Sequence, residues 1–273
     1  VTHYMLNKSN KTGKNMVEVL FNGHAGRLEG RYYKSERPNA PVALILHPHP
    51  QYGGTMNNKV VYTLFSCFKD LSFSVLRFNF RSVGRSQGQF EDGPGELSDA
   101  TIALDWLQNM NPDAKQCWIA GYSFGAWIGL QLLMRRPDIN NFIAVSPPAN
   151  EKDFSFLAPC PASGLIIQGG KDEIVNPYQV ESMAHKLNQQ RNVDIDFALI
   201  EDGDHMYNNH LGDLYKVSGQ YVISALQRRS PLKKRRGRRK KSELDDDLLL
   251  EGPEDEEILD NDIDDEDDLN SEE

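Results

Sequence analysis

The sequence contains few cysteines. Cys67, Cys117 and Cys160 are the only three among 273 residues, and no two of them form a C-x-x-C pair. An odd number of isolated cysteines is unlike the paired framework of a secreted, disulfide-held protein. It also supplies no cysteine pair for a structural zinc site. We therefore expect a cytoplasmic protein with no metal and no cofactor.

Long hydrophobic runs are missing as well. No stretch approaches the roughly 18 apolar residues that indicate a transmembrane helix, so we expect no membrane span. The first fifteen residues contain Lys8, Lys11 and Lys14 and lack the apolar core of a signal peptide. We expect residues 1–15 to form a flexible leader ahead of the folded domain.

The chain up to residue 227 has no excess of either charge. Ten of the 30 Lys and Arg residues lie at positions 228–241, and 18 of the 40 Asp and Glu residues at 243–273. The remaining 20 basic and 22 acidic residues nearly balance, which gives no reason to expect nucleic-acid binding by this part. Residues 230–273 are too polar to bury a core, and we expect a disordered, basic-then-acidic tail. The basic block could contact a polyanion or a protein, or the acidic half could simply screen it.

Apolar runs of strand length alternate with helix-like segments between residues 16 and 229, which we expect to form a single domain. Strands are expected at 17–21, 28–33, 42–46, 73–78, 117–121, 142–146, 164–168 and 195–200. Helices are expected at 56–68, 95–108, 124–135, 178–188 and 211–227. Continuous apolar runs such as VALIL are typical of strands covered on both faces. The pattern predicts an α/β fold with a mostly parallel central sheet and helices on both faces.

A Gly-Tyr-Ser-Phe-Gly motif occupies residues 121–125, after a strand-like run and before a helix-like one. A serine on such a strand-to-helix turn stands clear of the sheet, and glycines beside it let neighbouring backbone approach closely. A serine hydroxyl is a weak nucleophile and needs a base, which in turn needs an orienting group. The motif predicts Ser123 as a nucleophile. The alternative is a tight turn with an incidental serine.

The base and the orienting acid are expected later in the chain. His205 lies in a loop five residues beyond the last expected strand, and we predict it as the base in preference to His185 and His210. Asp172 follows the preceding strand and two glycines, and we predict it as the orienting acid. Glu173, Asp202 and Asp204 are weaker candidates.

Acyl transfer also needs N–H donors for a developing oxyanion. We predict the backbone N–H of Phe124, directly after the serine, and that of His49 in the sequence HPHP. Pro48 and Pro50 cannot donate. The histidines at 47 and 49 could instead form half of a metal site, but no carboxylate or cysteine follows at ligand spacing.

The sites discussed above lie in a series of six sequence segments. In chain order these are LILHPHPQYGGTMNNKVV, LRFNFRSVGRSQG, AGYSFGAW, SPPAN, GGKDEIV and DGDHMY. Over residues 17–227 the chain resembles small bacterial α/β-hydrolases described as predicted esterases. The resemblance implies the α/β-hydrolase fold and a triad of Ser123, Asp172 and His205. It does not extend to the charged tail.

Only about seventeen residues, 147–163, separate two of the expected strands at the place where many α/β-hydrolases carry a lid. That is too few for a lid domain, so we expect an open site for short-chain or bulky esters. Arg81 and Arg85 could hold an anionic group of the substrate, although pairing with Glu91 or Asp92 is the simpler interpretation. Tyr122 could contact substrate or serve only in packing.

The predicted function is hydrolysis of a small-molecule carboxylic ester through an acyl-enzyme. The same residues could act on a thioester or on an Xaa-Pro peptide. A different class is a non-catalytic binding scaffold, which would have no need of the complete triad.

Overall fold

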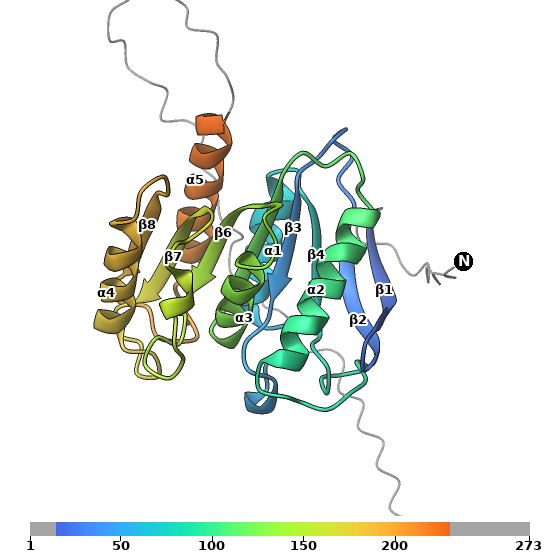
Figure 1. Cartoon of the computed structure of the whole chain (residues 1–273), viewed down its shortest axis with the longest axis horizontal. Coiled ribbons are helices and arrows are strands. Elements are labelled where there is room, and N and C mark those ends of the chain that lie inside the picture. Colours follow the sequence, from blue (N-terminus) through green and yellow to red (C-terminus); the bar gives the residue numbers. More distant parts are fainter. Residues whose placement is uncertain (1–14, 230–273) are drawn as a thin grey trace, which may run out of the picture. The chain divides into compact units, whose positions relative to one another are not determined.

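The computed structural model describes residues 15–229. The expected leader at 1–15 falls outside this range except for its last residue, and the expected tail at 230–273 falls outside it entirely. The described residues form one eight-stranded sheet flanked by helices (Figure 1).

The strands and helices alternate along most of the chain. The strands are β1 (Met16–Gly23), β2 (Gly26–Tyr33), β3 (Val42–Leu46), β4 (Ser74–Phe78), β5 (Cys117–Tyr122), β6 (Ile139–Val145), β7 (Ser163–Gly169) and β8 (Ile195–Ile200). The α-helices are α1 (Lys59–Asp70), α2 (Pro94–Asn109), α3 (Phe124–Leu133), α4 (Pro177–Asn188) and α5 (Leu211–Arg229). Two single turns of 3-10 helix, η1 (Pro50–Tyr52) and η2 (Ser155–Leu157), lie in loops.

The strand order is β1-β2-β4-β3-β5-β6-β7-β8. β1 pairs antiparallel with β2, and β2 pairs antiparallel with β4. The six strands from β4 to the other edge of the sheet, β3 included, run parallel to one another. After β3 the chain adds β4 on one side of it and then β5 on the other side, so the order in which strands are added to the sheet reverses at β3. Loops at the carboxyl ends of parallel strands meet there, which is where open α/β sheets bind their ligands.

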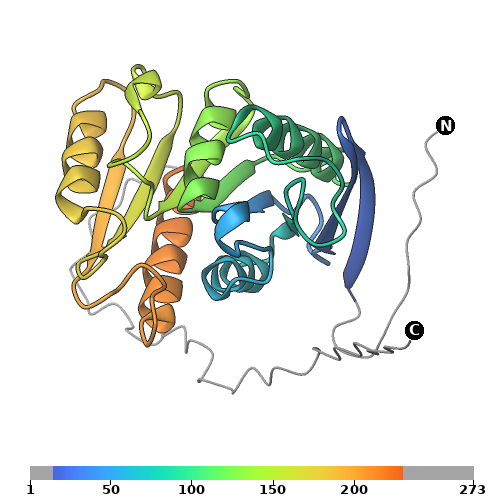
Figure 2. The same cartoon turned by 90° about the horizontal axis from the view of Figure 1, so that it is seen from below.

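Helices cover both faces of the sheet, as the apolar runs predict (Figure 2). Side chains of α2, α3 and α4 pack on one face, and those of α1 and α5 on the other. The five residues of β3 are all buried and alternate between the two cores: Val42, Leu44 and Leu46 point to one, Ala43 and Ile45 to the other. A strand buried on both faces needs such an unbroken apolar run.

The connection from β6 to β7 is short. It runs from residue 146 to 162 and contains the single turn η2 as its only regular element. No lid domain is built at this position, in agreement with the spacing in the sequence. None of the helices between residues 15 and 229 combines the length and the hydropathy that a bilayer crossing requires.

Candidate active site

Ser123 lies on the sharp turn between β5 and α3. Its φ and ψ are 53° and −118°, a conformation that residues with a side chain rarely adopt. Its backbone N–H donates to Val145 O at 2.8 Å, and its carbonyl accepts from Ala126 N at 2.9 Å. These bonds hold a strained residue between the end of the sheet and the start of a helix, the geometry of a nucleophile elbow.

The two glycines of the motif are required by close backbone contacts. A Cβ on Gly121 would lie 2.3 Å from Gly125 O, and a Cβ on Gly125 would lie 2.4 Å from Leu46 O. Both distances are well inside van der Waals contact. A side chain at Gly121 would therefore push the start of α3 away from the end of β5, and one at Gly125 would push the elbow away from the end of β3.

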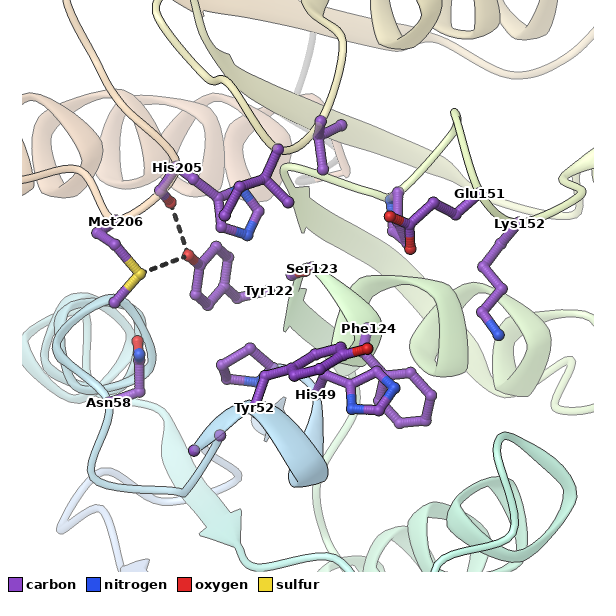
Figure 3. A pocket seen from close by; sticks show the side chains of 16 residues that line it. His49, Tyr52, Asn58, Tyr122, Ser123, Phe124, Glu151, Lys152, His205 and Met206 are labelled. Atoms are coloured by element: carbon purple, nitrogen blue, oxygen red, sulfur yellow. Dashed lines mark hydrogen bonds between the residues drawn. The ribbon is translucent and has the colours of Figure 1, made fainter.

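His205 lies in the loop after β8 and is joined to Asp172 in the loop after β7. The distance from His205 Nδ1 to Asp172 Oδ2 is 2.8 Å. Because a carboxylate oxygen accepts, Nδ1 carries a proton, and in the neutral ring this leaves the lone pair on Nε2. Nε2 makes no hydrogen bond with any residue in the range 15–229, and Figure 3 shows the His205 ring facing the same cavity as Ser123.

The Asp172 carboxylate is held rigidly. Its Oδ1 accepts from the backbone N–H groups of Ile174 and Val175 at 2.9 and 2.7 Å, and its Oδ2 also accepts from Gln168 Nε2 at 2.9 Å. Burial favours the neutral acid, but the hydrogen bonds from His205, Val175 and Gln168 outweigh it and keep the pKa of Asp172 below its usual value. The side chain is thus a buried anion aimed at the imidazole.

The competing acids have other partners. Asp204 accepts from the backbone and side-chain nitrogens of Asn208, both at 2.8 Å. Asp202 forms an exposed ion pair with Lys171 at 2.7 Å. Neither contacts the His205 ring, so the structure brings His205 together with Asp172 alone among these candidates.

The two predicted oxyanion donors flank the elbow. Phe124 is the first residue of α3, and His49 lies between β3 and η1. Neither backbone N–H donates to another group in the described part of the chain. The His49 ring packs against Phe124, Phe90 and Tyr52 with centroid distances of 5.0, 5.0 and 4.5 Å. This cluster fixes the loop relative to the start of α3.

The neighbouring His47 has a different environment. It is fully buried, its Nδ1 donates to Pro48 O at 2.7 Å, and its Nε2 accepts from Phe80 N at 3.0 Å. Burial lowers the pKa of His47 to about 4, so the ring is neutral. Both ring nitrogens are thus occupied, and the Nε2 contact ties the loop after β3 to the segment that follows β4. Within residues 15–229, no cluster of three or more His, Cys, Asp or Glu side chains has the arrangement of a metal site.

Ser123 and His205 line one cavity of about 230 Å³ (Figure 3). Pro48, His49 and Phe124 form another side of it, and Glu151 and Lys152 lie at its edge. This cavity can hold a small acyl or alkoxy group beside the serine. It lies open to solvent at the carboxyl edge of the sheet.

Tyr122 also lines the cavity, but its hydroxyl is already occupied. It donates to the backbone carbonyl of His205 at 2.6 Å and lies 3.6 Å from Met206 Sδ. On the other side of the same loop, the hydroxyl of Tyr207 lies 2.9 Å from that of Ser146. Two buried tyrosines therefore hold the loop that carries His205. Neither contact has a local signal in the sequence, because each joins residues more than 60 positions apart.

The arginines considered for substrate binding do not line the cavity. Arg81 is buried and paired with Asp99 at 2.9 Å and with Glu91. Its pKa is raised chiefly by the hydrogen bonds to Asp99. Arg85 pairs with Glu29 at 2.8 Å. The simpler interpretation, pairing with loop acids, fits Arg81 and Glu91, whereas Asp92 pairs instead with Lys152 at 2.9 Å.

Known proteins share this architecture. Residues 88–228 match the model of the dienelactone hydrolase family. An uncharacterized protein of Rickettsia prowazekii is 51% identical over 213 residues, which cover 77% of this chain and 90% of that protein. A protein of unknown function from Agrobacterium tumefaciens, described as an α/β hydrolase candidate, is 53% identical with a TM-score of 0.76, covering 78% of this chain and 97% of that one.

A third relative bears on the open site. An α/β serine hydrolase without lid from Xanthomonas campestris is 31% identical with a TM-score of 0.69, covering 79% of this chain and 97% of that one. The relatives and the eight-stranded sheet confirm the predicted lid-less α/β-hydrolase fold. This chain belongs to the dienelactone hydrolase family and is an enzyme of the serine hydrolase type.

Proposed function

We propose that this protein hydrolyses carboxylic esters through an acyl-enzyme on Ser123. The observation that carries the proposal is the hydrogen bond of 2.8 Å between Asp172 and His205, at a cavity that His205 lines together with the elbow serine. Such a pair holds an imidazole in the tautomer that can take a proton from a hydroxyl.

The reaction has two halves. Ser123 Oγ attacks the ester carbonyl carbon while His205 Nε2 takes its proton, and the N–H groups of Phe124 and His49 stabilise the oxyanion. His205 then returns that proton to the departing alkoxide, which leaves an acyl-serine. Water attacks the acyl-serine with His205 again as base, and the acid is released with the free serine.

A fluorophosphonate probe tests the nucleophile. We expect the wild-type chain to be labelled at Ser123, and Ser123→Ala to be neither labelled nor active. Ser98→Ala, on helix α2, serves as the matched control and should be labelled as the wild type is. If the wild type takes up no label, the chain is better described as a binding scaffold.

A substrate panel then separates the acyl derivatives. We expect p-nitrophenyl esters to be turned over faster than acyl-CoA thioesters and aminoacyl-prolyl amides. Activity confined to thioesters or to the prolyl amides would replace the ester proposal by a thioesterase or an Xaa-Pro peptidase with the same triad.

A further inference from the structure

A second, larger hollow adjoins the catalytic cavity. It lies between the β6–β7 connection and helix α4 and has a volume of about 780 Å³, compared with about 230 Å³ for the cavity. Lys152 lines both hollows. Pro148 lines the cavity, and its neighbour Ala149 lines the second hollow, which we call the groove. In the same way Val175 lines the cavity and its neighbour Asn176 lines the groove. The two spaces are therefore next to each other along two separate loops.

The ridge between them is fixed and partly apolar. Asn150 Nδ2 donates to Ile174 O at 3.0 Å and so joins the loop after β6 to the loop after β7. The Ile174 side chain, which lines the cavity, is 57% exposed. A group attached to the reacting ester can pass along the exposed Ile174 side chain, and Lys152 is the charged residue that lines both hollows.

The groove has an apolar floor and a firmly held wall. Phe154, Leu157 and Leu187 are buried beneath it, and Met183 packs against the same core. Gln190 ties its two sides together, since its Nε2 donates to Leu157 O at 2.9 Å and its Oε1 accepts from Cys160 N at 2.6 Å. These contacts make the groove a built feature of the fold.

Exposed apolar side chains gather around the two hollows. Six large apolar residues of the described chain are exposed, and four of them line the cavity or the groove: Tyr52, Ile174, Met206 and Tyr178. Isolated exposed apolar residues are ordinary, but a group of them at a concave surface marks a binding site.

Charge does not dominate the groove. Lys152 is paired with Asp92 at 2.9 Å and lies 4.6 Å from the centre of the Trp127 ring. The other charged residues that line the groove are one acid, Asp153, and one base, Lys186. This balance favours an uncharged occupant over a polyanion.

We propose that the groove between the β6–β7 connection and α4 is a second substrate subsite, which receives an apolar or aromatic half of an ester whose other, small half occupies the cavity beside Ser123. The inference rests on the proposed function, because it takes Ser123 as the reacting group. The cavity alone is smaller than the roughly 300–1,000 Å³ of most ligand sites, so a larger substrate has to extend beyond it.

Filling the groove tests this assignment. Ser182 is exposed on α4 and lines the groove, and Ser182→Trp places an indole there. We would compare kcat/KM for methyl acetate, methyl 4-phenylbutyrate and 2-naphthylmethyl acetate. In the wild type we expect at least one of the larger esters to be preferred. In Ser182→Trp we expect the ratio of that ester to methyl acetate to fall about tenfold.

The matched control is His185→Trp. His185 is exposed on the same helix but lines a separate hollow facing β8, so the ratio should stay at the wild-type value. Tyr178→Ala removes an exposed ring from the groove, and we expect it to raise KM for the larger ester about fivefold or more. The two larger substrates show whether the groove receives the acyl or the alcohol half.

The outcomes separate this inference from the proposed function. If Ser123 is labelled and methyl acetate is cleaved, yet Ser182→Trp keeps the wild-type ratio, the groove assignment is wrong and the esterase stands. If Ser182→Trp also sediments as a smaller species than the wild type, the groove is a contact between copies of the chain. If Ser123 takes no label, both proposals fail.

Discussion

Asp172 differs from the other acids near His205 in what its carboxylate accepts. Four hydrogen bonds reach it, from His205, Gln168 and the backbone of residues 174 and 175. Asn at this position would keep the shape but present an N–H₂ to the imidazole and favour the wrong tautomer. We expect Asp172→Asn to lower kcat by about 10³–10⁴-fold, measured with a p-nitrophenyl ester. Asp204→Asn, next to His205 in sequence, is the control and should lose less than threefold. Equal losses in the two variants would contradict the assignment.

His47 couples the stability of the fold to pH. Its pKa is about 4 in the folded protein because the ring is buried, against about 6.5 for a solvated histidine. The unfolded chain therefore binds the extra proton between pH 6.5 and 4, and the free energy of unfolding falls as the pH drops through this window. We expect a contribution of about 2 kcal/mol to be lost between pH 8 and pH 5.

Urea unfolding at several pH values measures this effect. His47→Gln should show a shallower dependence between pH 7 and 5, whatever its absolute stability. His24→Gln, which removes an exposed histidine, should keep the wild-type dependence. An unchanged slope in His47→Gln would show that other groups cause the acid sensitivity.

Single residues were predictable where chemistry restricts the choice. The elbow serine, the loop histidine and the acid after β7 follow from motif and chain order, and the structure places His205 and Asp172 in contact. The pairing of Arg81 with Glu91 was considered from the sequence, but its pairing with Asp99 was not predictable, because Asp99 lies 18 positions away on a helix and reaches Arg81 only through the fold. The contact of Tyr122 with His205 O, 83 positions apart, was missed for the same reason.

At the scale of elements, local sequence determined the boundaries well. β3 and β8 begin and end at the predicted residues. Helix α1 begins at Lys59, three residues later than predicted, because the Asn58 side chain accepts from Val60 N at 2.9 Å and caps the helix there. β6 begins earlier than predicted, at Ile139, since pairing with Cys117 extends the strand through two polar asparagines that the apolar pattern excluded.

The loop between β8 and α5 carries His205 and depends on its tyrosine contacts. Burial raises the pKa of Tyr122, which keeps the hydroxyl a neutral donor to His205 O. Without that donor the loop can shift, and small displacements of a base cost rate. We expect Tyr122→Phe to lower kcat about tenfold with little change in KM, measured on a p-nitrophenyl ester.

Tyr32, another buried tyrosine, provides the control for Tyr122→Phe. The Tyr32 hydroxyl donates to Asn111 at 3.0 Å, between β2 and the end of α2, and lines neither hollow. Tyr32→Phe should lose a similar amount of stability, about 1 kcal/mol, while kcat stays at the wild-type value. Equal losses of kcat in the two variants would mean that Tyr122 acts on the fold as a whole and does not position the base.

At the scale of the whole molecule, the class of the fold was predictable and its topology was not. Alternating strands and helices predict a parallel sheet with two helical layers, but no local pattern tells that β4 lies between β2 and β3. That order brings the loop after β3, which carries His49, next to the elbow after β5. The family match begins at residue 88 and so includes Ser123, Asp172 and His205 but not His49. The proposed oxyanion role of His49 therefore rests on the geometry of the sheet.

The short β6–β7 connection determines how the enzyme meets an insoluble substrate. This connection, residues 146–162, contains one turn of 3-10 helix as its only regular element, so within the described residues it offers no lid that could open at a lipid surface. We expect the rate of tributyrin hydrolysis to saturate smoothly as its concentration passes the solubility limit, measured by pH-stat titration. A lipase with a known lid, run in parallel, should show a jump at the same point. A jump with this protein would require a closing element that the described residues do not contain, and the open site would have to be abandoned.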